Sequence, residues 1–166
     1  MQDSGAETPD ARLDEDLAAA WLTHDLDPHT RTTLAELGRR VKVPATETLL
    51  REGEPTDILA IVLNGRVGLR VRVPERGQVT IMTVEVGDIV GWSALVPPNR
   101  ATSTAVALVD TELAVFDGPR LRDAIAADAR LAAHLYPVLL TAVARRLEGT
   151  RLQLLDLFSE RWVEPW

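Results

Sequence analysis

The most constraining stretch of the chain is residues 66–73, which read RVGLRVRV. Apolar residues alternate there with arginine or glycine without interruption, and this period of two is typical of a β-strand. The residues predicted on one buried face of that strand are Val67, Leu69, Val71 and Val73. From about Val41 onward this period replaces the helical period of 3.6 that precedes it. The sequence therefore predicts that the middle of the chain is built from strands.

Short segments of the same kind recur through the middle of the sequence. We predict strands at residues 40–43, 48–51, 58–63, 66–73, 79–84, 102–108 and 111–116. Asn64-Gly65 has the sequence of a type I′ turn, which predicts a hairpin between the third and fourth segments. Val109-Asp110 is predicted to pair the last two segments in the same way. Roughly eight short strands predict a mainly β fold, an eight-stranded jelly-roll β-barrel with flanking helices.

Helical patterns occur on both sides of this β region. They predict helices at residues 13–22, 28–38 and 119–127, and a long helix in the final segment. Residues 1–11 are rich in Gly, Pro, Asp and Ser and are expected to be disordered. The predicted organisation is therefore a disordered segment (1–11), helices with a jelly-roll domain (12–128), and a C-terminal dimerisation helix with its tail (129–166).

The last helix carries a heptad-like stripe. Its members, spaced by 3, 4, 3, 4 and 3 residues, are Leu140, Val143, Leu147, Thr150, Leu154 and Leu157. Such spacing places them along one seam of a helix and is typical of a coiled coil. The sequence predicts a homodimer interface formed by Leu140, Val143, Leu147, Leu154 and Leu157. The alternative is that this stripe packs on the barrel of its own chain.

Composition excludes several classes of function. The 166 residues include no cysteine, so disulfides, thiolate nucleophiles and cysteine metal sites are excluded. The three histidines lie far apart, and no set of nucleophile, base and orienting residue is visible, so we expect neither a metal site nor an enzyme. No apolar run approaches the roughly 20 residues that span a bilayer, and no secretion signal opens the chain. A cytoplasmic protein without membrane contact is expected.

Nucleic-acid binding is also disfavoured. The net charge is −7, whereas phosphate binding depends on an excess of Lys and Arg. The sequence ends eight residues after Phe158, which leaves no room there for a helix-turn-helix. We therefore expect a regulatory function that does not involve DNA.

The stretch most suited to a ligand is residues 86–107, VGDIVGWSALVPPNRATSTAVA. Gly87 and Gly91 occur where the backbone has to turn or to approach another group closely. Ser93 is predicted to cap a short helical turn over residues 94–96, which ends before two prolines. Arg100, Thr102 and Ser103 follow within one loop length. A capped helix start beside an arginine is suited to an anion.

Two stretches carry a resemblance to a known family. Residues 53–67, GEPTDILAIVLNGRV, resemble a strand pair of the cyclic-nucleotide-binding domain found in catabolite activator proteins and protein kinase regulatory subunits. Residues 86–88 and 91–95 resemble the phosphate-binding cassette of that family, and residues 111–113 resemble the strand that closes it. The chain looks like a stand-alone bacterial member. The resemblance implies a jelly roll with helices at its ends and a regulatory, ligand-binding role.

The cassette departs from the family pattern at two positions. The resemblance implies a glutamate that accepts the ribose hydroxyl, but Trp92 stands there, and an indole cannot accept a hydrogen bond. It also implies an arginine that holds the cyclic phosphate, but Ala101 stands there, with Arg100 one residue earlier. Trp92 either stacks on a flat ligand or fills the pocket. The candidate ligand-binding residues are Gly91, Trp92, Ser93, Ala94, Leu95, Arg100, Ala101, Thr102 and Ser103.

We therefore interpret the chain as a non-enzymatic sensor or regulatory module with a degenerate pocket that binds cyclic AMP and cyclic GMP weakly. Its candidate ligands are a cyclic nucleotide or another small anion, and its expected partners are a second copy of itself and another regulatory protein or enzyme. Two alternatives remain open at this point. One is a protein–protein adaptor whose pocket is closed by Trp92. The other is a genuine cyclic-nucleotide receptor that uses Arg100.

Overall fold

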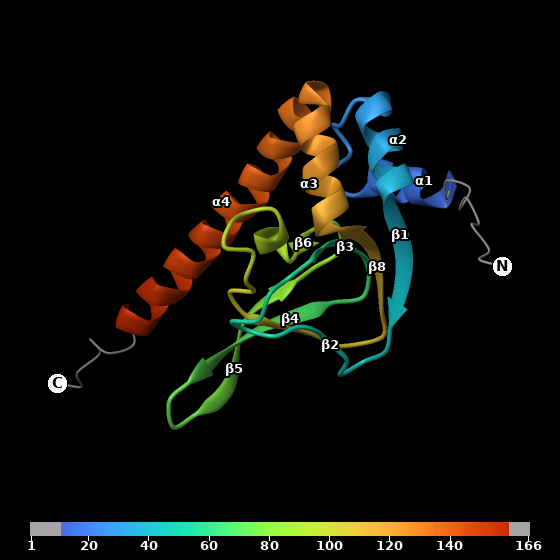
Figure 1. Cartoon of the computed structure of the whole chain (residues 1–166). Helices are drawn as coiled ribbons and strands as arrows, with labels where there is room; N and C mark the ends of the chain where they lie inside the picture. Colours follow the sequence, from blue (N-terminus) through green and yellow to red (C-terminus); the bar gives the residue numbers. More distant parts are fainter. Residues whose placement is uncertain (1–10, 160–166) are drawn as a thin grey trace.

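The computed structural model describes residues 11–159, in which eight strands form two antiparallel sheets (Figure 1). The strands are β1 (Gly38–Val43), β2 (Thr48–Leu50), β3 (Ile58–Asn64), β4 (Val67–Val73), β5 (Gly77–Val84), β6 (Ile89–Val90), β7 (Thr104–Ala107) and β8 (Thr111–Asp117). Their order is β1-β8-β3-β6 in one sheet and β2-β7-β4-β5 in the other. The predicted jelly-roll fold is confirmed, although the two sheets do not close into a continuous barrel.

Four α-helices and one short 3₁₀ helix accompany the sheets. They are α1 (Ala11–Ala19), α2 (Pro28–Leu37), η1 (Trp92–Ala94), α3 (Gly118–Ala127) and α4 (Ala129–Ser159). Asp27 caps α2 by accepting a hydrogen bond from the Thr30 amide, and Pro28 occupies the first turn, where its missing N–H costs nothing. The segment expected to be disordered, residues 1–11, lies outside the described residues except for Ala11.

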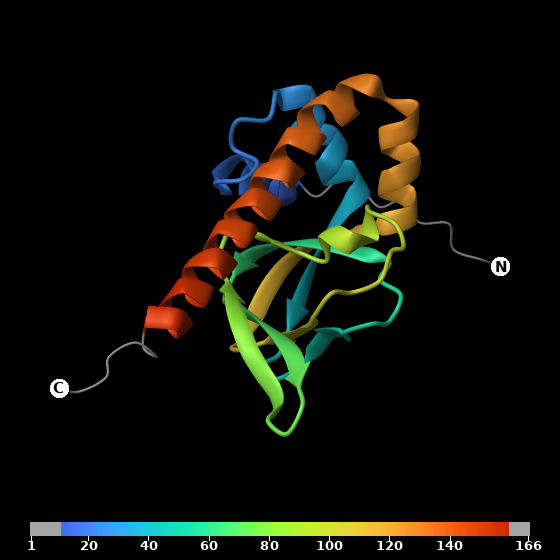
Figure 2. The same ribbon diagram turned by 90° about the vertical axis from the view of Figure 1, so that its left-hand side faces the viewer.

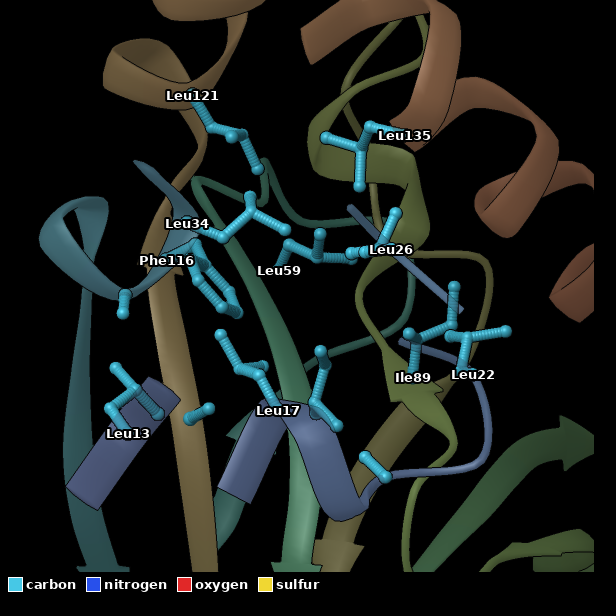
Figure 3. Close-up of a cluster of buried hydrophobic side chains, with 14 of the residues drawn as sticks. Leu13, Leu17, Leu22, Leu26, Leu34, Leu59, Ile89, Phe116, Leu121 and Leu135 are labelled. Carbon is cyan, nitrogen blue, oxygen red and sulfur yellow. The ribbon is translucent and has the colours of Figure 1, made fainter. Parts of the chain in front are cut away.

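The sheet β1-β8-β3-β6 is buried on both faces. Along β3, Leu59 and Ile61 point to the helices, whereas Ala60 and Val62 point to the second sheet, as the two-residue period of a strand requires. Phe116 on β8 is fully buried on the helix side, among leucines of α1, α2 and α3 (Figure 3). This sheet therefore separates two cores, one under the helices and one between the sheets.

The arginine-rich strand β4 belongs to the second sheet. Val67 and Leu69 are buried between the sheets, as predicted, but Val71 and Val73 are only partly buried. The predicted buried face is therefore found in the first half of the strand, whereas in the second half it is only partly buried. The reason is visible in Figures 1 and 2, where the hairpin of β4 and β5 extends beyond the rest of the β structure. The register also shifts between Leu69 and Arg70.

Both hairpins predicted from turn sequences are wrong. β3 pairs with β6 and β8, while β4 pairs with β5 and β7, so Asn64-Gly65 carries the chain from one sheet to the other. Val109-Asp110 does the same between β7 and β8. The two crossings pack against each other, because the Leu108 amide donates to the Arg66 carbonyl at 2.9 Å. A Cβ on Gly65 (φ +89°) would lie 2.6 Å from the Thr111 hydroxyl, so this corner requires glycine.

Helix α4 runs from α3 diagonally across the β structure (Figure 2). Its inner face, defined here as Leu131, Leu135, Ala142 and Arg146, lies against the rest of the chain, and the first three are buried. Its outer face, defined here as Tyr136, Leu140, Val143 and Leu147, points the other way. Leu140 is 70% exposed and Leu147 51% exposed, so both present at least half of their surface to solvent. The side chains of Leu154 and Leu157 lie outside the described residues.

Candidate functional site

The centre of the candidate site is the turn at Gly91, which leads from β6 into η1. Gly91 adopts a left-handed conformation with φ at +78° and serves as the N-cap of η1. A Cβ there would lie 2.3 Å from the Ile58 carbonyl oxygen, so no other residue fits without moving β3. Ser93 was predicted to be the cap, but it lies inside η1 and is buried. The prediction placed the helix start too late, because a left-handed glycine begins the turn without a side-chain cap.

The loop after η1 is held in place by hydrogen bonds to its backbone carbonyls. The Asn99 amide nitrogen donates to the Ser93 carbonyl at 3.1 Å and to the Ala94 carbonyl at 3.0 Å. Arg122 of α3 also donates to the Ala94 carbonyl. Ala94 is fully buried, and Leu95 packs partly buried against the core under the helices. These two predicted site residues therefore position the loop.

Arg100 and Ala101 point to opposite sides of an extended segment. The Ala101 amide donates to the Glu54 carbonyl at 2.9 Å, and the Ala101 carbonyl accepts from the Gly53 amide at 2.8 Å. Successive side chains in such a segment alternate, so the buried Ala101 faces the interior and Arg100 faces solvent. The Arg100 guanidinium donates to the Gly53 carbonyl at 2.8 Å. It therefore braces the turn after β2 and does not line the cavity described next.

A small cavity lies beside Gly91 and brings most of the predicted site residues together. Its lining residues are Leu50, Leu69, Val90, Gly91, Trp92, Ser93, Ala101, Thr102, Ser103 and Arg146. Its free volume is about 10 Å³, which is close to the minimum that a single water molecule needs. Trp92 lines the cavity and also packs, partly buried, against the core under the helices. The site is therefore almost completely filled by the protein's own side chains.

Arg146, on the inner face of α4, is the polar lining residue that the sequence reasoning missed; Leu50, Leu69 and Val90 are apolar lining residues that it also missed. One of its terminal nitrogens donates to the Ile89 carbonyl at 2.7 Å, while its buried Nε has no hydrogen-bond partner. Burial lowers the pKa of the guanidinium, and the Asp88 carboxylate opposes this by raising it. A signal was present in the sequence: the inner stripe of Leu135 and Ala142, continued by one helical turn, reaches Arg146.

A second depression lies at the opposite end of the β structure from the helices. It has a volume of about 430 Å³ and is lined by Lys42, Val43, Pro44, Asn64, Asp110, Thr111 and Glu112. It is open to solvent, and its acidic groups already have partners. Asp110 accepts from the Ala45 amide at 2.9 Å, and Glu112 pairs with Arg40 at 2.9 Å. This depression has the character of a surface hollow between loops.

The part of the chain that the structure describes contains neither a cluster of metal-ligating side chains nor a helix that could span a membrane. Within residues 11–159 no three His, Cys, Asp or Glu side chains are arranged to hold a metal ion. Over the same residues none of the helices is both apolar enough and long enough to cross a bilayer. The chemistry of the described site thus rests on Arg146, the hydroxyl-bearing residues Ser93, Thr102 and Ser103, and the indole of Trp92.

Comparison with known proteins agrees with this geometry. Residues 40–128 match the family "Cyclic nucleotide-binding domain". A CRP-like cAMP-activated global transcriptional regulator of Mycobacterium tuberculosis is 30% identical over 145 residues, which cover 87% of this chain and 63% of the regulator. The chain thus spans less than two thirds of that relative's length.

Solved structures show the same fold. A cyclic nucleotide-binding domain from Methylobacillus flagellatus superimposes with a TM-score of 0.75 at 24% identity, over 87% of this chain and 81% of that one. The catabolite activator protein of Thermus thermophilus gives a TM-score of 0.65 at 25% identity, over 83% of this chain and 62% of that one. From the matched residues, the jelly roll and the cassette turn at Gly91, it follows that the chain belongs to the cyclic nucleotide-binding domain family.

Proposed function

We propose that this chain is a non-catalytic, cytoplasmic regulatory module whose cassette does not bind cyclic AMP or cyclic GMP tightly. The observation that carries the proposal is the cavity beside Gly91, whose free volume of about 10 Å³ is far too small for a nucleoside. Trp92, Ala101 and Arg146 occupy the space around it. A cyclic nucleotide could enter only if Trp92 and α4 moved away from the sheets.

The chemistry of the lining residues supports the same proposal. Trp92 offers no acceptor for a sugar hydroxyl, and Ala101 offers no charge for a phosphate. Each missing charge-assisted hydrogen bond typically costs about 1.5–3 kcal/mol, so two of them weaken a micromolar site by a few hundredfold or more. We therefore expect millimolar dissociation constants at best for both cyclic nucleotides.

The geometry favours a closed pocket over a receptor that uses Arg100. The Arg100 side chain lies on the solvent side of its segment and is engaged with the Gly53 carbonyl at 2.8 Å. To reach the cavity it would have to break this bond and reverse the segment paired with residues 53–56. Of the two alternatives raised by the sequence, the adaptor with a closed pocket is therefore favoured.

Calorimetry with the two cyclic nucleotides tests the proposal. The wild-type protein should give no saturable heat at micromolar to sub-millimolar nucleotide, whereas the double variant W92E/A101R should gain measurable affinity. The variant R100Q is the matched control, and its weak binding should equal that of the wild type. Micromolar affinity of the wild-type protein, lost in R100Q, would overturn the closed-pocket proposal and establish Arg100 as the phosphate ligand.

We also propose that the module is a homodimer held by the outer face of α4. Three large side chains lie in line along this face and are each more than half exposed: Tyr136, Leu140 and Leu147. Their spacing matches the heptad predicted from the sequence, and a second copy of the same helix presents a complementary apolar seam. The excess of acidic residues, with a net charge of −7, favours this partner over DNA.

A further inference from the structure

A third pocket lies outside the cassette, where two junctions between a helix and a strand meet. It is formed by the end of α2 with the start of β1, and by the end of β8 with the start of α3 (Figure 1). Its volume is about 290 Å³, near the lower limit for pockets that bind small molecules. Its charged lining residues are Glu36, Arg39, Asp117 and Arg120, and its apolar side chains are Leu37 and Val115. None of these residues lines the cavity beside Gly91.

The register of β1 and β8 explains how these groups come together. Arg39 on β1 is paired with Val115 on β8, and the side chains of such a cross-strand pair lie on the same face of the sheet. Asp117 follows Val115 by two residues and therefore points to that face as well. The chain then turns into α3, whose third residue is Arg120. One strand pair and one helix start thus bring two arginines and a carboxylate to the same pocket.

Both arginines of this pocket are available to a ligand. Arg39 and Arg120 are exposed, and within residues 11–159 neither guanidinium has a hydrogen-bond or ion-pair partner. The larger hollow lined by Asp110 and Glu112 differs in this respect, because its carboxylates are already engaged. Guanidinium groups recognise carboxylates well, since their N–H donors form a planar fork. The two arginines therefore suit the carboxylate of a ligand.

The acidic residues of the pocket restrict the ligand further. Glu36, in the last turn of α2, is exposed and likewise has no partner in the described part of the chain. Asp117 is the N-cap of α3 and accepts a hydrogen bond from the Arg120 amide at 2.8 Å, which engages one of its two carboxylate oxygens. A simple anion is attracted by the arginines but repelled by these acids. A ligand that carries both charges is attracted by both kinds of group.

The apolar part of the pocket is small, because Leu37 is partly buried and Val115 is buried. A side chain of only a few carbon atoms matches this surface and the volume of about 290 Å³. We propose that the pocket binds a free amino acid with a small apolar side chain, its carboxylate on Arg39 and Arg120 and its ammonium group on Glu36. This site goes beyond the proposed function, since it does not depend on whether the cassette binds a nucleotide.

Calorimetry of the full-length chain with L-alanine and L-valine tests the site. The ionic strength is held constant so that general salt effects cancel. L-Valine should bind saturably. Two analogues of L-valine separate its charges, because isovalerate lacks the ammonium group and isobutylamine lacks the carboxylate. Each analogue should bind at least about tenfold more weakly than L-valine, which is the usual consequence of losing a charge-assisted hydrogen bond.

Three substitutions assign the binding groups. R39Q and R120Q should each weaken the binding of L-valine by at least about tenfold, and both should fold because the wild-type side chains are exposed and make no contact of this kind within residues 11–159. E36Q should weaken L-valine but bind isovalerate no worse than the wild type does, because only the ammonium group needs Glu36. The matched controls R76Q and E85Q change exposed residues outside the pocket and should bind L-valine as the wild type does.

Three outcomes would overturn the proposal. The first is that neither amino acid binds saturably to the wild-type protein, and the second is that R39Q or R120Q keeps the wild-type affinity. The third is that isovalerate binds as tightly as L-valine, which would identify a site for anions only. Micromolar binding of cyclic AMP would overturn the proposed function alone, because the two pockets share no lining residue.

Discussion

The two faces of α4 differ sharply although both are rich in leucine. On the inner face, Leu131 and Leu135 are 1% and 3% exposed and pack against the core under the helices. On the outer face, Leu140 and Leu147 are 70% and 51% exposed. One face therefore belongs to the fold of its own chain, whereas the other is the face that the proposed dimer would cover.

The largest effect is expected from truncating the inner face. L135A should lower the free energy of unfolding by about 2–5 kcal/mol, because it leaves a cavity in a packed core. L140A should change it by less than about 0.5 kcal/mol, because an exposed side chain loses little on truncation. Urea denaturation of the dilute monomer measures both values. Equal effects of the two variants would contradict the distinction between the faces.

A smaller effect on stability, but a large one on assembly, is expected from charging the outer face. Burial of a leucine contributes roughly 1.5–3 kcal/mol, and an unpaired carboxylate in an apolar interface costs more. L140D/L147D should therefore weaken self-association by about a hundredfold or more. Light scattering over a concentration series should show dimers for the wild type and monomers for the variant.

The matched control for this experiment is T141D. Thr141 is exposed and lies about a quarter turn away from the line that joins Leu140 to Leu147, so the same charge is added outside the seam. T141D should associate as the wild type does. A wild-type protein that stays monomeric at tens of micromolar would contradict the dimer.

The strands other than β6 were predictable from the sequence, but the pairing of strands was less so. Alternation along residues 66–73 is a local property, and β4 lies where it predicts. A turn sequence such as Asn64-Gly65 reports only that the backbone reverses with a left-handed glycine. Which sheet receives the next strand depends on the crossing at Val109-Asp110, which packs against it. Both errors therefore arise at one corner, where two turns that are distant in sequence pack against each other.

The part of the candidate site that lies in one continuous loop was predictable from the sequence. Gly91, Trp92, Ser93, Ala101, Thr102 and Ser103 were identified from the cassette motif and line one cavity. Arg100 and Ala101 are neighbours in sequence, and only the pairing of their segment with residues 53–56 decides which one faces the cavity. Arg146 comes from a different element, and its position depends on how α4 crosses the β structure. The stripe of Leu135 and Ala142 places Arg146 on the inner face of the helix, but which part of the β structure this face meets has no local signal.

A third prediction concerns the boundary between the two faces of α4. Arg145 lies outside the cavity, with its guanidinium 4.1 Å from the centre of the Trp21 ring, whereas its neighbour Arg146 enters the cavity. R145A should lower the free energy of unfolding by about 0.5–1 kcal/mol, the usual contribution of an exposed cation–π contact. The double variant W21A/R145A, compared with W21A, should show no further loss. If the R145A substitution still lowers the free energy of unfolding when Trp21 is already replaced by alanine, the effect comes from another contact of Arg145.

The smallest effect is expected at the start of the inner face, where Asp27 joins α2 to α4. Its carboxylate accepts from the Thr30 hydroxyl and pairs with Arg130 at 2.9 Å and with His134 at 3.2 Å. The hydrogen bond from Thr30 is the main cause that lowers the pKa of Asp27 below its ordinary value of 3.8. Burial opposes this, and the charges of Arg130 and His134 lower the pKa further.

A lowered pKa means that the folded state favours the ionised form of Asp27. Its stabilising effect is therefore complete above pH 3.8, the ordinary value, and is lost as the pH falls through the lower pKa of the folded state. D27N should be less stable than the wild type at neutral pH, and the difference should shrink as the solution becomes strongly acidic. Urea denaturation across this pH range measures it, with D25N, at an exposed carboxylate of the same loop, as the control. A difference between D27N and the wild type that stays constant with pH would mean that Asp27 acts through the geometry of its cap and not through its charge, and that its ion pairs with α4 contribute nothing to the packing of the inner face.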